Sequence, residues 1–179
     1  MKHVLFTFIL AALLITLSSP SYAQYQVGKN TGGILIGVGG GGLDGSGAIP
    51  ISVEYNFLNF EKNIQAGLFA SYAHTSDDAA WGKWAYTNIV IAAQGNWHFY
   101  PGEKFDPFIG ASLGYNIASA SWTWNATYAN AGYPSPSVTA GGFFYSGQAG
   151  FNYWFTPKMA GQLRVGYYPY VAAGLTLAM

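Results

Sequence analysis

The sequence has no cysteine and little charge. Without cysteine there is no disulfide framework, no thiolate chemistry and no residue to carry the lipid of a lipoprotein. Charged residues make up 8% of the chain, whereas a typical soluble domain has roughly 25%. The formal net charge is zero, so no basic field is present to attract nucleic acid. Composition therefore argues against a charged soluble surface and against a nucleic-acid partner.

Long hydrophobic runs are also missing, apart from residues 4–17 near the N-terminus. This run has 14 residues, fewer than the roughly 20 that a spanning helix needs. It follows Lys2, and small residues at Ser21 and Ala23 give the spacing of a signal peptidase site. We predict a signal peptide over residues 1–23 and a mature domain over residues 24–179, with an uncleaved signal anchor as the alternative.

Hydrophobic residues, at 51%, and aromatic residues, at 18%, are abundant and follow a two-residue period. In Ile51 to Phe57 the odd positions are apolar or aromatic and the even positions are polar. Successive strand side chains point to opposite faces, so this pattern predicts a two-faced strand. The same pattern predicts eight strands, over residues 32–40, 49–57, 63–73, 86–100, 107–121, 141–155, 159–167 and 170–179.

An exported, charge-poor chain without a spanning helix favours a closed barrel, because lipid leaves no backbone group unpaired. The predicted connections are short after the second, fourth and sixth strands and longer after the first, third and fifth, which is typical of outer-membrane barrels. Aromatic residues gather at both strand ends, as in interfacial girdles. We predict an all-β, eight-stranded antiparallel up-and-down transmembrane barrel with both termini in the periplasm. A soluble, lipocalin-like barrel would instead place its charged residues on the outside.

The polar face is built from Gly, Ser, Asn, Gln and Thr, and only Glu54 and Arg164 place charges within the predicted strands. Unpaired, each charge would be costly inside a narrow lumen. We therefore hypothesise that the two side chains meet across it. A polar network would be completed by Gln65, Gln94, Asn96, Gln148 and Asn152. The alternative interpretation of the pair is a gated proton or ion path.

Residues 122–138 form the longest predicted loop and carry no charge. An exposed apolar patch often marks a contact surface. The candidate contact residues are Trp122, Trp124, Tyr128 and Tyr133.

Three segments resemble the outer-membrane β-barrel domain family, the small eight-stranded barrels of the OmpX and OmpA type. They are PFIGASLGYN at residues 107–116, FFYSGQAGFNYWFTPK at residues 143–158 and LRVGY at residues 163–167. The resemblance implies outer-membrane lipid and the barrel assembly machinery as partners, and it specifies no activity. One departure is the end of the chain, Leu177-Ala178-Met179, because such barrels usually end in an aromatic residue that the assembly machinery reads.

Other motifs give weak signals. Gly37, Gly39 and Gly42 fit G-x-G-x-x-G, but another strand follows where a dinucleotide site needs a helix. His74 and His98 are expected at opposite ends of the barrel, and Asp77 with Asp78 lack the ligand spacing of a cation loop. We predict no catalytic, cofactor or metal site.

The expected function is that of a monomeric, non-enzymatic outer-membrane barrel with a structural or surface-interaction role. A protein or a glycan outside the cell would contact its outer loops. One alternative is a narrow pore for small solutes or ions. A less favoured alternative is a lipid-modifying enzyme, for which only His74 would lie near the outer leaflet.

Overall fold

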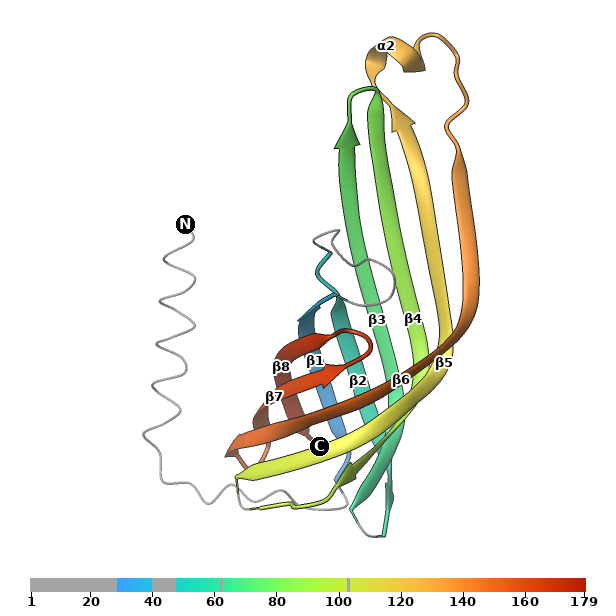
Figure 1. The fold of residues 1–179 in the computed structure, drawn as a ribbon. Helices are drawn as coiled ribbons and strands as arrows, with labels where there is room; N and C mark the ends of the chain where they lie inside the picture. The colour runs from blue at the N-terminus through green and yellow to red at the C-terminus, as the bar shows by residue number, and fades with distance from the viewer. Residues whose placement is uncertain (1–28, 40–47, 62, 103) are drawn as a thin grey trace, which may run out of the picture.

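The computed structural model describes residues 29–39, 48–61, 63–102 and 104–179, and their strands close into a barrel (Figure 1). Each strand pairs antiparallel with the next, and β1 pairs with β8 to complete the circle. The predicted all-β, eight-stranded, up-and-down barrel is confirmed. The strands are β1 (Thr31–Val38), β2 (Ile51–Phe60), β3 (Ile64–Ala79), β4 (Gly82–His98), β5 (Phe105–Trp124), β6 (Ser137–Thr156), β7 (Met159–Gly166) and β8 (Val171–Ala178).

Two sequence predictions lie outside the described residues. These are the signal peptide over residues 1–23 and Gly42 of the G-x-G-x-x-G pattern. No helix in the described part of the chain is long and apolar enough to cross a bilayer.

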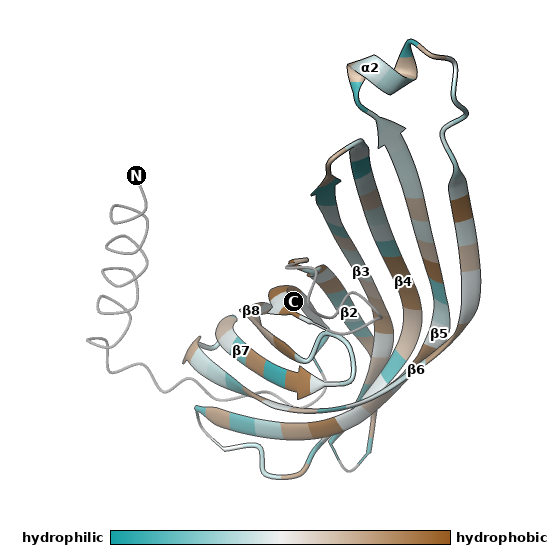
Figure 2. Ribbon diagram, turned by 45° about the horizontal axis from the view of Figure 1, so that its top comes forward, coloured by the Kyte–Doolittle hydropathy of each residue, from teal (hydrophilic) through white to brown (hydrophobic). Residues whose placement is uncertain are grey.

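Alternation along the strands separates an apolar outer face from a polar lumen. On β1, Ile34 is 61% exposed while Leu35 is fully buried. On β2, Val53 is 50% exposed and the adjacent Glu54 only 6%. Figure 2 shows the same alternation as hydrophobic and hydrophilic bands along the strands. An outer band of exposed aliphatic side chains is the surface that a bilayer solvates.

The eight strands differ greatly in length. β1, β7 and β8 have 8 residues each and β2 has 10, whereas β3 to β6 have 16 to 20. β2 pairs with β3 only up to Tyr72, so the four long strands continue as a sheet of their own (Figure 1). We call residues 73–79, 82–88, 118–124 and 137–140 the extension.

The extension overlaps two segments that the sequence predicts as loops. The sequence prediction ends its third strand at residue 73, starts its fourth at residue 86 and leaves a loop between them. This loop is wrong, because β3 runs to Ala79 and β4 begins at Gly82, so Asp77 and Asp78 lie in a strand. The predicted loop over residues 122–138 is also too long, because β5 runs to Trp124 and β6 begins at Ser137. Between them lies the short helix α2 (Ala126–Ala129).

Side-chain polarity on the outer face marks where the bilayer ends. One cross-strand row joins Tyr72, Ile89 and Ile117, and its side chains are apolar. The next row towards the extension is polar, and it consists of His74, Thr87, Ser119 and Thr139. We therefore predict that the surface of the bilayer on the side of the extension lies between these two rows, and we call this level the membrane boundary.

This boundary predicts different costs for the same substitution on one strand. Leu113 and Ser121 share the outer face of β5, with Leu113 below the boundary and Ser121 above it. Leu113→Arg should destabilise the barrel by about 2–4 kcal/mol, the cost of a cation at mid-bilayer. Ser121→Arg should change stability by less than about 0.5 kcal/mol. Urea unfolding in phospholipid vesicles measures both, and equal effects would contradict the boundary.

Candidate functional site: the lumen and the extension

The centre of the lumen holds a buried ion pair. Arg164 on β7 donates from Nη1 to Oε2 of Glu54 on β2 over 3.1 Å, although these strands are not neighbours. Gln94 on β4 donates to the same carboxylate oxygen, also over 3.1 Å. The guanidinium carbon of Arg164 lies 4.5 Å from the ring centroid of Phe69. The structure therefore brings the two charges that the sequence singles out together, with a third strand joining them.

Gln94 connects this pair to other polar side chains. Its Nε2 donates to Oδ1 of Asn56 over 2.9 Å. A second group joins Gln148 on β6 to Asn96 on β4, to which it donates over 2.7 Å, and to Ser112 on β5, from which it accepts over 3.0 Å. Because bonds in both groups join strands that are not neighbours, side chains reach across the interior at the level of Glu54 and Gln148.

The remaining two predicted network residues belong to separate groups. Gln65 lies towards the strand ends near the termini, where it donates to Asn59 and to the carbonyl of Lys29, both over 2.9 Å. Asn152 donates to Asp106 over 3.0 Å. The seven predicted residues therefore do not form one connected network in the contacts described.

Asp106 is a lumen residue that the sequence reasoning missed. Its side chain is fully buried, and Oδ1 lies 2.7 Å from Nδ1 of His98. The prediction started the fifth strand at Pro107, which left Asp106 in a turn; β5 begins at Phe105 instead. The interpretation that only Glu54 and Arg164 carry charges within strands is therefore wrong. The sequence contains one signal for this position. Asp106 lies two residues before Phe108, so in a strand both side chains point to the same, inward-facing side.

The two histidines lie far apart, as the sequence predicts. His98 ends β4 near the short turns, whereas His74 lies in the extension, where Nδ1 is 3.0 Å from the Thr87 hydroxyl. Within the described ranges, no three His, Asp or Glu side chains come close enough to hold a metal ion.

An aromatic cluster covers the inner face of the extension. Trp84 on β4 lies opposite Trp122 on β5, with ring centroids 5.2 Å apart. Trp124 follows Trp122 at 5.4 Å and contacts Tyr128 at 5.9 Å and Tyr133 at 5.7 Å. The structure therefore places the four predicted contact residues together and adds Trp84.

Their positions differ from the predicted single loop. Trp122 and Trp124 belong to β5 and Tyr128 to α2, while Tyr133 alone of the four lies in the connection to β6. Trp122 is only 8% exposed and forms the base of the cluster, whereas Tyr133 is 57% exposed. The indole of Trp124 donates to the carbonyl of Pro134 over 2.9 Å, which holds this connection against the sheet.

The two faces of the sheet exchange polarity at the membrane boundary. In the barrel the outer face is apolar and the lumen polar, but in the extension the tryptophans face inward. The outer side there carries Lys83, Asp78 and Thr123, with Lys83 Nζ 3.9 Å from Asp78 Oδ1. Such an exposed pair adds little stability. Its presence indicates that this face of the extension meets water and not lipid.

A closed eight-stranded barrel with an apolar outer band and a polar interior defines the class of small transmembrane β-barrels. The sequence model of the outer membrane protein beta-barrel domain matches residues 9–175, and the chain belongs to this family. The family resemblance seen in the sequence is confirmed, and the family places the protein in the outer membrane.

Solved structures of similar shape include small bacterial surface barrels. The attachment invasion locus protein Ail of Yersinia pestis is 13% identical, with a TM-score of 0.49, covering 84% of this chain and 93% of that one. Neisserial surface protein A is 13% identical, with a TM-score of 0.48 and coverages of 84% and 95%. A de novo designed transmembrane β-barrel is 12% identical, with a TM-score of 0.46 and coverages of 87% and 99%. No curated protein matched the sequence.

Family membership also orients the barrel. The connections at the end where β1 starts and β8 ends are all short, whereas the other end holds two long connections, after β1 and after β5, besides the short β3–β4 and β7–β8 turns (Figure 1). Outer-membrane barrels have short periplasmic turns and longer outer loops. This comparison predicts that the extension points away from the cell.

The buried pair predicts an asymmetry between single and double substitutions. Arg164→Met should destabilise the barrel by about 3–5 kcal/mol, because it leaves the Glu54 carboxylate buried without its partner. The double variant Glu54→Leu/Arg164→Met should recover much of this loss, since no charge remains. Urea unfolding in detergent micelles measures both, and an unchanged unfolding midpoint for Arg164→Met would show that the pair contributes nothing.

Proposed function

We propose that this protein is a non-enzymatic, non-conducting outer-membrane barrel that uses its extension to bind a protein or glycan at the cell surface. The observation that carries the proposal is the contrast between the two ends of the four long strands. Inside the membrane they and the four short strands enclose a lumen crossed by bonded side chains, and outside it they present an aromatic sheet face.

Two layers of side chains support a closed lumen. The polar layer contains the bond from Arg164 on β7 to Glu54 on β2. The apolar layer is the buried cluster of Phe69, Phe144 and Tyr168, in which the latter two rings stand 6.0 Å apart and nearly perpendicular. An eight-stranded interior is only wide enough for side chains to fill. This packing favours a structural lumen over the alternative of a narrow pore.

The extension supports binding through its aromatic content. Tyr133 is 57% exposed, Val138 61% and Trp81 at the tip of the β3–β4 hairpin 62%. Tryptophan and tyrosine combine large apolar area with a polar group, which makes them frequent anchors of interfaces. A surface of this kind outside the membrane is typical of a contact site.

The enzyme alternative has less support. His74 is on the outward face just above the membrane boundary, and its ring contacts the Thr87 hydroxyl over 3.0 Å. A nucleophile and base also need a third group that orients the base. The contacts described for His74 include no such group.

Electrical measurements test the closed lumen. The protein reconstituted in a planar bilayer should show no steady ionic current, because side chains of non-neighbouring strands bond across the interior. Heat-modifiable migration of the recovered protein on a gel shows that it was folded during the measurement, and a conducting porin provides the positive control. A steady, ohmic current from folded protein would favour the pore alternative.

Binding measurements test the extension. Cells that display the wild-type barrel should bind at least one member of an array of immobilised glycans and extracellular matrix proteins. Trp124→Ser/Tyr133→Ser should weaken that binding by about tenfold or more, the usual effect of removing a central aromatic anchor. Tyr100→Ser removes a 70% exposed tyrosine at the periplasmic end and should leave binding unchanged. Equal binding by the double variant and the wild type would contradict the role of the cluster.

A further inference from the structure

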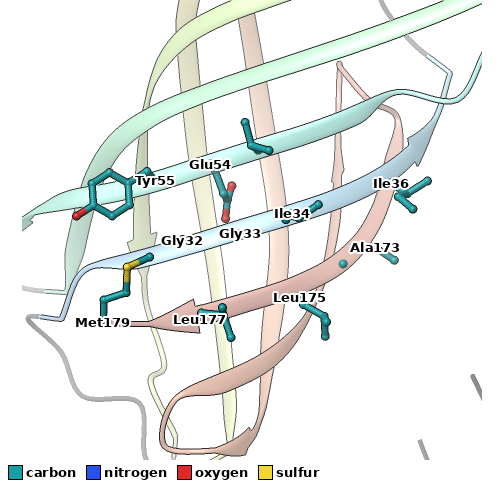
Figure 3. Close-up of a pocket in the computed structure, with 12 residues that line it drawn as sticks. Gly32, Gly33, Ile34, Ile36, Glu54, Tyr55, Ala173, Leu175, Leu177 and Met179 are labelled. Carbon is teal, nitrogen blue, oxygen red and sulfur yellow. The ribbon is translucent and has the colours of Figure 1, made fainter. Parts of the chain in front are cut away.

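A groove lies on the lipid-facing side of the barrel, where β1 closes against β8 (Figure 3). It has a volume of about 620 Å³. It is lined by residues of β1, β2 and β8 and by Met179, which follows β8. The lining side chains that face the lipid include Ile34, Ile36, Tyr55, Leu175, Leu177 and Met179. Glu54, whose side chain faces the lumen, also borders the groove, and none of the lining residues belongs to the extension.

Small residues at two outward positions open the groove. Gly32 lies in the same cross-strand row as Tyr55 on β2 and Leu177 on β8, so one side chain is missing between two large ones. We call the line along which β1 pairs with β8 the seam. Further along it, Ala173 lies opposite Ile36. The Met179 side chain reaches over Gly32, where a Cβ atom would lie 2.5 Å from its terminal methyl group (Figure 3).

Polar groups lie beside the end of the groove that Tyr55 lines. The Tyr55 hydroxyl accepts from the Asn30 side chain over 3.4 Å, and Asn30 accepts from Asn59 over 3.2 Å. Lys29 is adjacent to Asn30, and its carbonyl is held by Gln65. Its ammonium group takes part in none of the ion pairs among the described residues. Lys29 lies three residues before Gly32 in the chain, close to the strand end that carries these polar groups.

The surroundings determine what can fill the groove. The walls are mainly apolar and the groove opens towards the bilayer, which favours a hydrocarbon chain as its occupant. Within a bilayer there is no hydrophobic driving force between apolar surfaces, and packing decides which contacts form. An unfilled groove loses dispersion contacts along its whole length. A flexible acyl chain can fit the space above Gly32 and Ala173 and restore these dispersion contacts.

We propose that the β1–β8 seam binds one glycerophospholipid of the periplasmic leaflet. One acyl chain lies in the groove from Gly32 towards Ala173, and the phosphate lies beside Lys29. This arrangement combines an apolar channel with a cation at the depth where the lipid carries its charge. The proposal depends on the transmembrane barrel and not on the proposed binding role of the extension.

Native mass spectrometry of the folded protein, titrated with phosphatidylglycerol in detergent, tests the site. The wild type should retain one lipid per barrel. Gly32→Leu should weaken retention at least tenfold, since its side chain fills the groove and displaces only the flexible end of Met179. Gly147→Leu is the matched control: Gly147 is an outward-facing glycine of β6 with nothing within 4 Å of an added Cβ. It should bind as the wild type does.

Further arms separate the acyl chain from the headgroup. Lys29→Ser should reduce the preference for phosphatidylglycerol over phosphatidylethanolamine while retaining both, and glycerophosphoglycerol without acyl chains should not bind. Ala173→Leu blocks the other end of the groove and replaces Gly32→Leu if that variant does not show heat-modifiable folding. Undiminished lipid retention by a folded groove variant overturns the proposal. A dimer in place of a lipid adduct also overturns it, because the groove would then be an interface between copies.

Discussion

Backbone hydrogen bonding inside the bilayer is the constraint on which the rest of this structure depends. Hydrocarbon offers no partner to an N–H or C=O group, so a sheet can cross it only when it has no edge. β1 meets this requirement by pairing with β8 along its full length, from Thr31 opposite Ala178 to Val38 opposite Val171. Closing only eight strands leaves an interior just wide enough for side chains to fill. The lumen must then be packed with side chains, and Arg164 is tolerable there because Glu54 and Gln94 surround it.

Water removes this constraint, and the sheet changes where the bilayer ends. Above Tyr72, β3 no longer pairs with β2, and the four long strands form an open sheet. Their faces also exchange roles, because the outer face now meets water and the inner face no longer encloses a polar network. Trp84 and Trp122 therefore face inward, while Lys83 and Thr123 face outward. One continuous strand thus has two different amphipathic patterns.

The strand pattern and the central charges could be predicted from the sequence because both follow from local alternation. Glu54 and Arg164 stand out as charges on polar faces. The loop prediction for residues 122–138 was wrong because it assumed the barrel's polarity beyond the membrane, where β5 continues to Trp124. Asp106 was missed because a strand starting at Pro107 fits the alternation equally well. Parity allows Asp106 to face the lumen, and the register with β6, which places Asp106 opposite Asn152, shows that the strand begins early enough to include it.

Glycines on the two faces of the seam show which features the fold itself requires. Gly174 on β8 faces the lumen, and a Cβ atom there would collide with the carbonyl oxygen of Ile34 on β1. The close approach of these two strands therefore demands a glycine at this position. Gly32 faces the lipid, and the nearest atom to an added Cβ is the end of the Met179 side chain, which can move. Backbone packing does not require the gap at Gly32, so closure of the barrel does not by itself explain the shape of the groove.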